Sequence, residues 1–191
     1  MKILGRIIKI KRLIFGIVLF VALIAGGIFF YLTIIETMPQ PSINLFSEIP
    51  APGAGEKILV FAPHPDDESL GAGGYIAEAE SVGSIVKIVL VTDGNKHGKK
   101  DTRYAEFRQA TSDLGVPSNN LTYLNYPDGS LDNVDANALY NSLKLQIDSF
   151  VPEVIISTSP LDDHPDHSKV GETVAKIISD QKLNVLYYQY L

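Results

Sequence analysis

The sequence contains no cysteine among its 191 residues. A disulfide scaffold is therefore excluded, and so is any zinc site built from thiolates. The sequence also has no internal repeat. Its hydrophobic content of 46% is enough for one domain with a substantial core.

Basic residues are scarce after residue 12, where 11 Lys and Arg face all 22 Asp and Glu of the chain. Nucleic acids and anionic lipids are bound largely through clusters of positive charge. A segment this acidic is a poor candidate for either partner, and we expect no nucleic acid to bind.

Charge is absent altogether from Leu13 to Ile35, a run rich in Ile, Leu, Phe and Val. At about 1.5 Å of rise per residue, a helix of this length crosses a hydrocarbon core of roughly 30 Å. Five basic residues and no acid precede it, and basic flanks tend to stay in the cytoplasm. The pattern predicts a cytoplasmic tail (1–12), a single transmembrane anchor (13–35) and an extracytoplasmic remainder.

A cleaved signal peptide and a buried core helix are the alternatives for this run. The run exceeds the roughly 7–15 apolar residues of a signal peptide, and its small residues Ala25, Gly26 and Gly27 lie in its middle. Both facts favour an uncleaved anchor. Residues 36–56 are rich in Pro and Gly and are expected to be a linker.

From Lys57 onward, short β-branched runs alternate with longer amphipathic stretches, which predicts an α/β domain over 57–191 with a mainly parallel sheet and helices on both faces. The expected strands are 58–62, 86–92, 121–126, 154–159 and 185–190, and the expected helices are 69–82, 102–114, 134–150 and 167–181. Ligands of such sheets bind beyond the carboxyl ends of the strands. With strand order 3-2-1-4-5, the first and fourth strands are neighbours there.

Two polar clusters follow these neighbouring strands, "PHPDDE" at 63–68 and "LDDHPDH" at 161–167. His64 and Asp67 are one helical turn apart, so both can point at a common centre, and His167 can supply a third ligand. Two imidazoles and one carboxylate with an open position are typical of a catalytic zinc site.

The other polar residues of the clusters can then take part in catalysis or support the metal ligands. Asp66 can accept a proton from water, His164 can face a developing oxyanion, and Asp166 can orient a histidine. Taken alone, the acids at 66–68 fit helix capping as well as a catalytic or metal-binding role. For Glu68, support of the site and helix capping are equally good interpretations. Taken together, the two clusters favour a metal site.

Two further segments carry weaker signals. The glycines of "GAGG" (71–74) do not have the spacing of a dinucleotide-binding loop and are expected to let a helix pack closely under the site. The loop "TDGNKHGKKDTR" (92–103), which contains His97, fits a solvated loop. Its place at the same sheet edge also allows contact with an anionic or sugar substrate.

The order of these motifs resembles the PIG-L/LmbE-like N-acetylglucosaminyl deacetylases. The resemblance rests on "PHPDDE", "TDG" (92–94), R-x-x-E from Arg103 to Glu106, "LGV" (114–116) and "HPDH" (164–167). It implies a Rossmann-like three-layer fold and one zinc ion per chain, held by His64, Asp67 and His167. It also implies Asp66 as general base, His164 as electrostatic or acid catalyst, and Arg103 near the substrate.

The implied reaction is metal-assisted hydrolysis of the N-acetyl group of an N-acetylglucosamine conjugate. With an extracytoplasmic domain, a lipid-linked or cell-surface glycan is the expected substrate. Relatives usually continue beyond the point where this chain stops, so we expect a fragment or a missing C-terminal part. A metal-containing glycan-binding module without catalysis and a non-haem iron oxygenase are the alternatives.

Overall fold

The computed structural model describes residues 2–35 and 49–191, with the side chains of the first helix described for residues 11–31. The chain divides into two units, Met1–Ile49 and Pro50–Leu191. Most of the expected linker, residues 36–48, lies outside the described residues. The folded unit begins at Pro50 rather than at Lys57, because the Gly55 N–H donates to the Gly83 carbonyl at 2.8 Å and ties this segment to the domain.

The first unit contains the long helix α1 (Lys2–Ile35). Its segment Lys11–Tyr31 is long and apolar enough to cross a membrane, and none of it is buried against protein. A signal sequence passes the same test of length and composition. The helix is therefore a candidate span, as the uncharged run predicts.

The second unit is built on a five-stranded parallel sheet in the order β3-β2-β1-β4-β5, which confirms the predicted order. The central strand β1 pairs with β2 on one side and with β4 on the other, with Ile58 opposite Val154. The strands are β1 (Lys57–Ala62), β2 (Ile85–Thr92), β3 (Leu121–Tyr126), β4 (Val154–Thr158) and β5 (Leu186–Tyr190).

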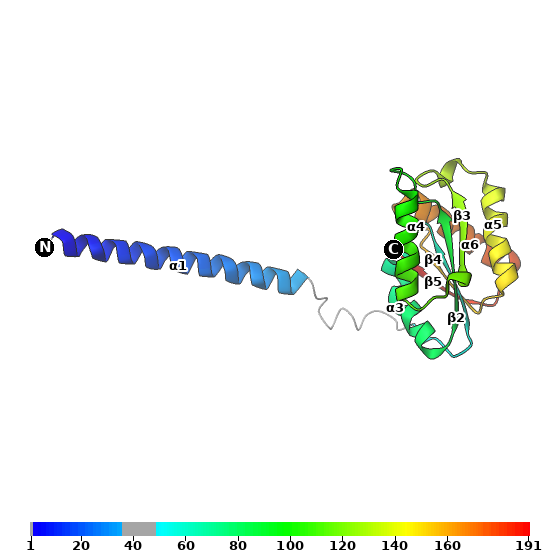
Figure 1. The fold of residues 1–191 in the computed structure, drawn as a ribbon, viewed down its shortest axis with the longest axis horizontal. Coiled ribbons are helices and arrows are strands. Elements are labelled where there is room, and N and C mark those ends of the chain that lie inside the picture. The colour runs from blue at the N-terminus through cyan, green and yellow to red at the C-terminus, as the bar shows by residue number, and fades with distance from the viewer. Residues whose placement is uncertain (1, 36–48) are drawn as a thin grey trace. The chain divides into compact units, whose positions relative to one another are not determined.

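Helices cover both faces of this sheet (Figure 1). Along β1, Ile58, Val60 and Ala62 belong to one buried cluster, and Leu59 and Phe61 belong to the other. Because successive side chains of a strand point to opposite faces, a strand buried on both faces is apolar throughout. The first cluster packs under α3 (Asp67–Val82) and α4 (Lys100–Asp113), and the second under α5 (Ala136–Phe150) and α6 (Pro165–Gln181).

Three helices, α3, α4 and α6, begin two residues earlier than their apolar periodicity predicts, and α3 and α6 carry candidate metal ligands in their first turns. α3 starts at Asp67 and α6 at Pro165. Proline is well suited to the first helical position, where its missing N–H would have no partner within the helix. Asp67 and His167 therefore lie in the first turns of two helices, directly beyond the carboxyl ends of β1 and β4.

The glycines of "GAGG" do not all serve close packing. A Cβ on Gly71 would come within 2.2 Å of the Tyr190 ring, but one on Gly73 would make only ordinary contact and one on Gly74 would meet nothing within 4 Å. Close approach therefore explains only Gly71, and the expectation for the other two glycines was wrong.

Gly171→Ala is expected to destabilise the domain by about 1–3 kcal/mol, the usual range for overpacking. A Cβ at Gly171 in α6 would lie 2.5 Å from the Thr158 carbonyl oxygen and 2.7 Å from the Pro160 nitrogen, both backbone atoms. Gly74→Ala is the matched control and is expected to stabilise by about 0.5–1 kcal/mol through helix propensity alone. Denaturant unfolding measures both, and equal effects would contradict the packing argument.

Candidate metal centre

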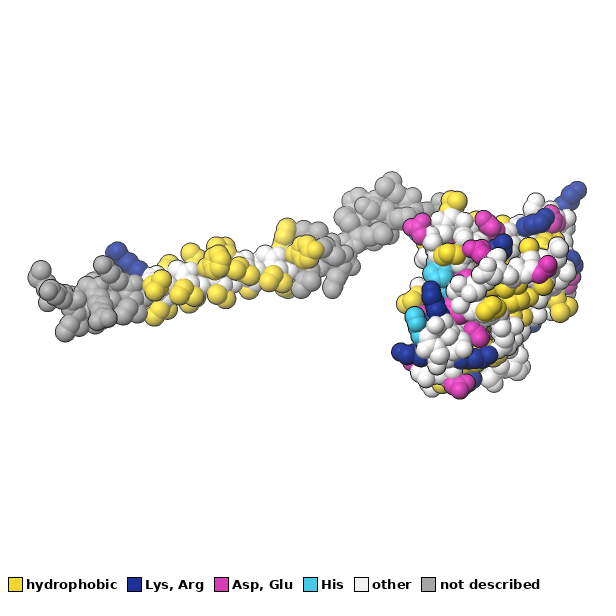
Figure 2. All heavy atoms as spheres, turned by 90° about the horizontal axis from the view of Figure 1, so that it is seen from above, with side chains coloured by type: hydrophobic (Ala, Val, Ile, Leu, Met, Phe, Trp, Pro, Cys, Tyr) yellow, Lys and Arg dark blue, Asp and Glu magenta, His cyan; other side chains and the backbone are white. Residues whose placement is uncertain are grey.

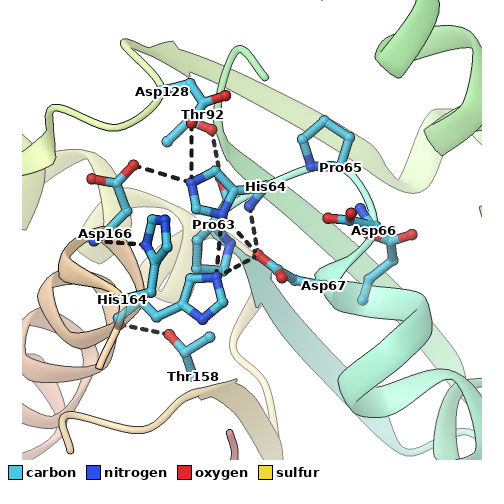
Figure 3. Close-up of polar contacts among 12 residues, drawn as sticks. Pro63, His64, Pro65, Asp66, Asp67, Thr92, Asp128, Thr158, His164 and Asp166 are labelled. Atoms are coloured by element: carbon cyan, nitrogen blue, oxygen red, sulfur yellow. Dashed lines mark hydrogen bonds and ion pairs between the residues drawn. The ribbon is translucent and has the colours of Figure 1, made fainter. Parts of the chain in front are cut away.

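The segments that follow β1 and β4 meet beyond the carboxyl ends of these paired strands. Backbone and side-chain hydrogen bonds fix where each segment turns. The Thr92 hydroxyl donates to the Pro63 carbonyl at 2.7 Å, and the Thr158 hydroxyl donates to the His167 carbonyl at 2.7 Å. Figure 3 shows His64, Asp67, His164 and Asp166 pointing toward one another from these segments.

Three side-chain atoms form a nearly equilateral triangle, which we call the donor triangle. Its corners are His64 Nδ1, Asp67 Oδ2 and His167 Nε2. The two imidazole nitrogens are 3.2 Å apart, and each lies 3.3 Å from the carboxylate oxygen. A tetrahedral metal ion with bonds of about 2.0–2.1 Å requires ligand atoms about 3.3 Å apart. The donor triangle therefore fits three ligands of a tetrahedral divalent metal.

The far nitrogen of each imidazole in the triangle faces a carboxylate. His64 Nε2 lies 3.1 Å from Asp166 Oδ2, and His167 Nδ1 lies 3.0 Å from Asp162 Oδ2. A carboxylate in this position keeps the proton on the far nitrogen, so that the near nitrogen is free to bind a metal. The two carboxylates thus favour the tautomer and the orientation of both histidines that metal binding needs.

A second acidic set surrounds His64 on its far side and consists of Asp128 and Asp166. Asp166 is only 1% exposed, and its two oxygens already accept the Gly129 N–H at 2.7 Å and the Leu131 N–H at 3.0 Å. These backbone bonds occupy the carboxylate and fix its orientation. Asp166 is therefore better placed to hold His64 than to bind a metal itself.

His164 lies beside the triangle, with its ring centroid 4.8 Å from that of His64 and 4.7 Å from that of His167. As the N-cap of α6, its Nδ1 accepts the Asp166 N–H at 3.2 Å. Burial, together with the charges of His64 and His167, lowers the pKa of His164. A neutral His164 whose Nδ1 accepts a hydrogen bond carries its proton on Nε2, where it can be donated to a ligand.

Asp66 lies to the side of the histidines (Figure 3), and its carboxylate forms an ion pair with Arg103 of α4 at 2.9 Å. Burial raises the pKa of Asp66, and the charge of Arg103 opposes that rise. The backbone of Asp66 has a φ of 146°, in a region that L-residues rarely adopt. Two contacts hold it there: Arg103 also donates to the Pro65 carbonyl at 2.7 Å, and the carboxylate of Glu68 accepts the Asp66 N–H at 3.2 Å.

Glu68 itself is fully buried and also accepts the Ser69 hydroxyl at 2.6 Å. Asp66, at the N-cap position of α3, makes no capping bond with its side chain, and Asp67 instead accepts the His64 N–H at 2.7 Å. The acids at 66–68 are thus directed mainly into the polar cluster, rather than serving helix capping alone.

An open pocket of about 260 Å³ lies at the donor triangle. Figure 2 shows histidine side chains reaching the surface of the domain among both basic and acidic neighbours. The expected site residues that line the pocket are His64, Asp66, Asp67, His97, Arg103, His164 and His167, and the structure adds Lys96 and Asp128. Glu68 and Asp166 are not among the lining residues and contact the site from behind.

The family model described as "PIG-L: GlcNAc-PI de-N-acetylase" matches residues 59–178, which is more than half of the chain. The chain belongs to the PIG-L family. All of the expected site residues, from His64 to His167, lie within the matched range, and α1 lies outside it.

One curated relative and two solved structures are similar to this chain. A probable N-acetyl-α-D-glucosaminyl L-malate deacetylase 2 of Bacillus subtilis is 29% identical over 140 residues, which is 66% of this chain and 62% of that protein. N,N'-diacetylchitobiose deacetylase from Pyrococcus horikoshii superposes with a TM-score of 0.59 at 26% identity, covering 67% of this chain and 51% of the other. A conserved protein of Thermus thermophilus gives 0.60 at 28% identity, covering 69% and 63%. The chain therefore spans about three fifths of the length of the curated relatives that it matches.

Two carboxylates of this PIG-L site were not expected from the sequence, Asp128 and Asp162. Asp128 follows β3, and its Oδ1 lies 3.3 Å from His64 Nε2. The sequence feature that could have indicated Asp128 is the turn "PDG" (127–129). This turn follows the third strand and lies at the same sheet edge as the two clusters. Asp162 stands within the second cluster, but the sequence does not distinguish it from the exposed neighbour Asp163.

The metal-free PIG-L chain is expected to lose stability as the pH rises from about 6.5 to about 9. Burial lowers the pKa of His64, but hydrogen bonds to Asp166 and Asp67 outweigh it and raise the pKa from 6.5 to about 9. A raised histidine pKa stabilises the fold below the unfolded value, and this contribution is lost as the pH passes the folded value. The full contribution of His64 to the free energy of unfolding is about 3 kcal/mol.

Urea unfolding with a chelator at pH 6 and at pH 9.5 measures this change. Asp166→Asn removes one of the carboxylates that raise the pKa of His64 and should therefore reduce the pH dependence. A stability of the wild-type chain that is the same at both pH values would contradict the electrostatic account.

Proposed function

We propose that this PIG-L family member is a zinc-dependent hydrolase that removes the N-acetyl group from an N-acetylglucosamine conjugate. The observation that carries the proposal is the donor triangle of His64, Asp67 and His167, with ligand atoms 3.2–3.3 Å apart. The relatives are named for action on N-acetylglucosaminyl malate and on diacetylchitobiose, which supports the substrate class.

The donor set suits zinc because it combines two neutral imidazoles with one carboxylate and leaves a side open toward the pocket. When bound there, the metal would supply Lewis-acid activation of a water molecule and of the amide carbonyl. Asp162 and Asp166 would hold the imidazoles in place through their far nitrogens.

Asp66 is proposed as the general base. It lines the same pocket as the donor triangle, and burial raises its pKa, which makes it a better proton acceptor. Asp66 takes a proton from the attacking water as the new C–O bond forms at the acetamide carbon. When the C–N bond breaks, a proton is delivered to the leaving amine nitrogen, so that the products are acetate and the free amino sugar.

His164 is proposed as the donor to the carbonyl oxygen that gains negative charge. Its Nδ1 already accepts a backbone N–H, so the proton of the neutral ring is on Nε2. A donor aimed at developing charge stabilises the transition state more than the ground state.

The alternative of a non-catalytic glycan-binding module does not need Asp66 or its strained backbone, since sugar binding requires no base beside the metal. Ligand sets of two histidines and one carboxylate also bind iron(II) in oxygenases. The parallel α/β sheet argues against that alternative, because such oxygenases usually have an all-β scaffold.

The domain is further proposed to be anchored in a membrane by α1, with residues 1–12 in the cytoplasm and the pocket on the other side. The uncharged length of α1 and the basic residues that precede it support this orientation. A lipid-linked or cell-surface glycan would then be the accessible substrate. With a reporter fused to the C-terminus, we expect reporter activity on the extracytoplasmic side of the membrane. Reporter activity in the cytoplasm would contradict the proposed orientation.

The test of the proposed activity is acetate release from a panel of N-acetylglucosamine conjugates by the full chain in non-ionic detergent, loaded in turn with zinc and with iron(II). We expect zinc-loaded protein to release acetate from at least one conjugate and chelated protein to release none. Binding of a conjugate without release of acetate would indicate the glycan-binding module. Oxygen consumption with iron(II) alone would indicate the oxygenase.

Asp162→Asn is expected to weaken zinc binding by about 10–100-fold, as is typical when the carboxylate behind a metal-bound histidine is lost. The amide keeps the shape of the side chain but removes the charge that faces His167 Nδ1 at 3.0 Å. Competition with a zinc chelator measures the change. Asp163→Asn replaces an exposed acid next in the sequence and should leave the affinity unchanged.

A further inference from the structure

The backbone of Asp66 is held by the first turn of its own helix, α3. Its N–H donates to the Glu68 carboxylate at 3.2 Å, and its carbonyl accepts the Ser69 N–H at 3.0 Å and the Leu70 N–H at 2.9 Å. All three partners lie within four residues of Asp66. None of these local bonds reaches the carboxylate, so they do not determine the direction of the side chain.

The carboxylate of Asp66 is held by Arg103, which comes from a different helix, α4. Arg103 Nη2 lies 2.9 Å from Asp66 Oδ2 and donates to the carbonyl of the preceding residue, Pro65, at 2.7 Å. Within residues 49–191, no other hydrogen bond or ion pair reaches this carboxylate. One guanidinium nitrogen thus contacts both the side chain of the proposed base and the peptide group before it.

Gly94, which follows β2, leaves room for this contact. Gly94 has a φ of +61°, and an added Cβ would lie 2.8 Å from Pro65 Cγ and 3.5 Å from Arg103 Cβ. A side chain at this position would therefore push Pro65 away. The motif "TDG" (92–94), which has no role in the proposed mechanism, thereby shapes the place where Pro65 and Arg103 meet.

The exposure of the pair indicates which partner is presented to a ligand. The side chain of Asp66 is 52% exposed, whereas that of Arg103 is 27% exposed, although both line the pocket. The carboxylate is therefore the more accessible group, and the guanidinium supports it from the side of α4.

We propose that Arg103 is a positioning residue, which holds the strained backbone at Asp66 and directs its carboxylate, and which acts on the reaction through this base rather than through a contact with the substrate. This inference rests on the proposed function, in which Asp66 takes the proton of the attacking water. A base must lie within hydrogen-bond reach of that proton. Without Arg103, the carboxylate can rotate and spends less time in the productive orientation.

Arg103→Met removes the guanidinium and keeps an unbranched apolar side chain. Arg108→Met is the matched control, since Arg108 is an exposed arginine of the same helix that does not line the pocket. We expect Arg103→Met in the full zinc-loaded chain to lower the kcat of acetate release by about 10- to 100-fold and to change KM by less than about twofold. Arg108→Met should change neither. A rise in KM at unchanged kcat would indicate a contact with the substrate and would overturn the inference.

The same replacement in an Asp66→Asn chain separates the two roles further. Two residues that act as a unit have non-additive effects, so Arg103→Met should not lower the kcat of Asp66→Asn any further. An equal fold-loss in both backgrounds would contradict the positioning role. Arg103→Lys keeps the charge without the planar guanidinium and should lose less kcat than Arg103→Met. Every variant should retain the zinc-dependent rise in Tm, which shows that the donor triangle is folded.

Amide hydrogen exchange over residues 64–70 tests the structural half of the inference without any substrate. Arg103→Met should speed exchange in this segment by about tenfold, as expected when a charge-assisted hydrogen bond is lost, and Arg108→Met should not. Unchanged exchange in Arg103→Met would overturn the inference. Failure of the proposed function gives a different result, namely no acetate from any conjugate, and the exchange data would still decide whether Arg103 holds the segment around Asp66.

Discussion

Replacing Asp66 with Asn is expected to lower the kcat of acetate release by about 10²- to 10⁴-fold, the usual contribution of a general base. Asparagine keeps the size of the side chain and tolerates a positive φ better than most residues, so the strained backbone at 146° should be preserved. Zinc affinity should change little, because the Asp66 carboxylate pairs with Arg103 and is not part of the donor triangle.

The pH profile gives a second observation on the same residue. A base must be deprotonated to act, and burial raises the pKa of Asp66. The kcat/KM of the wild type should therefore fall on the acid side as Asp66 gains a proton. Asp163→Asn, which changes an exposed acid outside the pocket, is the control and should retain full turnover. Equal turnover in Asp66→Asn and the wild type would remove Asp66 from the mechanism.

His167→Ala is expected to abolish zinc binding at micromolar concentration, together with acetate release. The substitution removes one corner of the donor triangle and also the partner of Asp162, and two remaining ligands bind a tetrahedral metal poorly. A ligand that binds only the folded state stabilises it by mass action. Zinc should therefore raise the Tm of the wild type and leave the Tm of His167→Ala unchanged.

His97→Ala is the matched control for this loss. His97 lines the same pocket but is outside the donor triangle, so its replacement should preserve the zinc-dependent rise in Tm. A variant lacking His167 that still gains stability from zinc, to the same extent as the wild type, would show that the metal binds elsewhere.

The main architecture was predictable because its signals are local. The strands of the sheet are runs of mainly β-branched, apolar and aromatic residues, and the two histidine clusters follow β1 and β4, which are neighbours in the sheet. The resemblance to the PIG-L family was confirmed by the match over residues 59–178. The starts of α3 and α6 were missed by two residues each, since polar first turns and a proline carry no apolar periodicity.

The role of Asp128 depends on long-range geometry that no local pattern encodes. β3 is two strands away from β1 in the sheet, so its loop would not be expected to reach His64. The loop returns because the Gly129 and Leu131 N–H groups both donate to Asp166. Similarly, the sequence could not tell which acid of the pair 162–163 faces His167, because the direction of a loop side chain depends on its backbone torsion angles.

The contact between Arg103 and Asp66 could also not be predicted from the sequence. The resemblance implied an arginine near the substrate, and the structure additionally pairs it with the proposed base and with the Pro65 carbonyl. This pairing couples α4 to the strained backbone after β1. Strain of this kind persists only where surrounding contacts hold it in place.

The most direct test of the account is a titration of the metal-free full chain with zinc while acetate release is followed. One metal site per chain, formed by the donor triangle, predicts that activity rises linearly and reaches its plateau at one equivalent of zinc. Activity of the metal-free chain equal to that of the loaded chain would contradict the account, as would a plateau that is reached only at two equivalents.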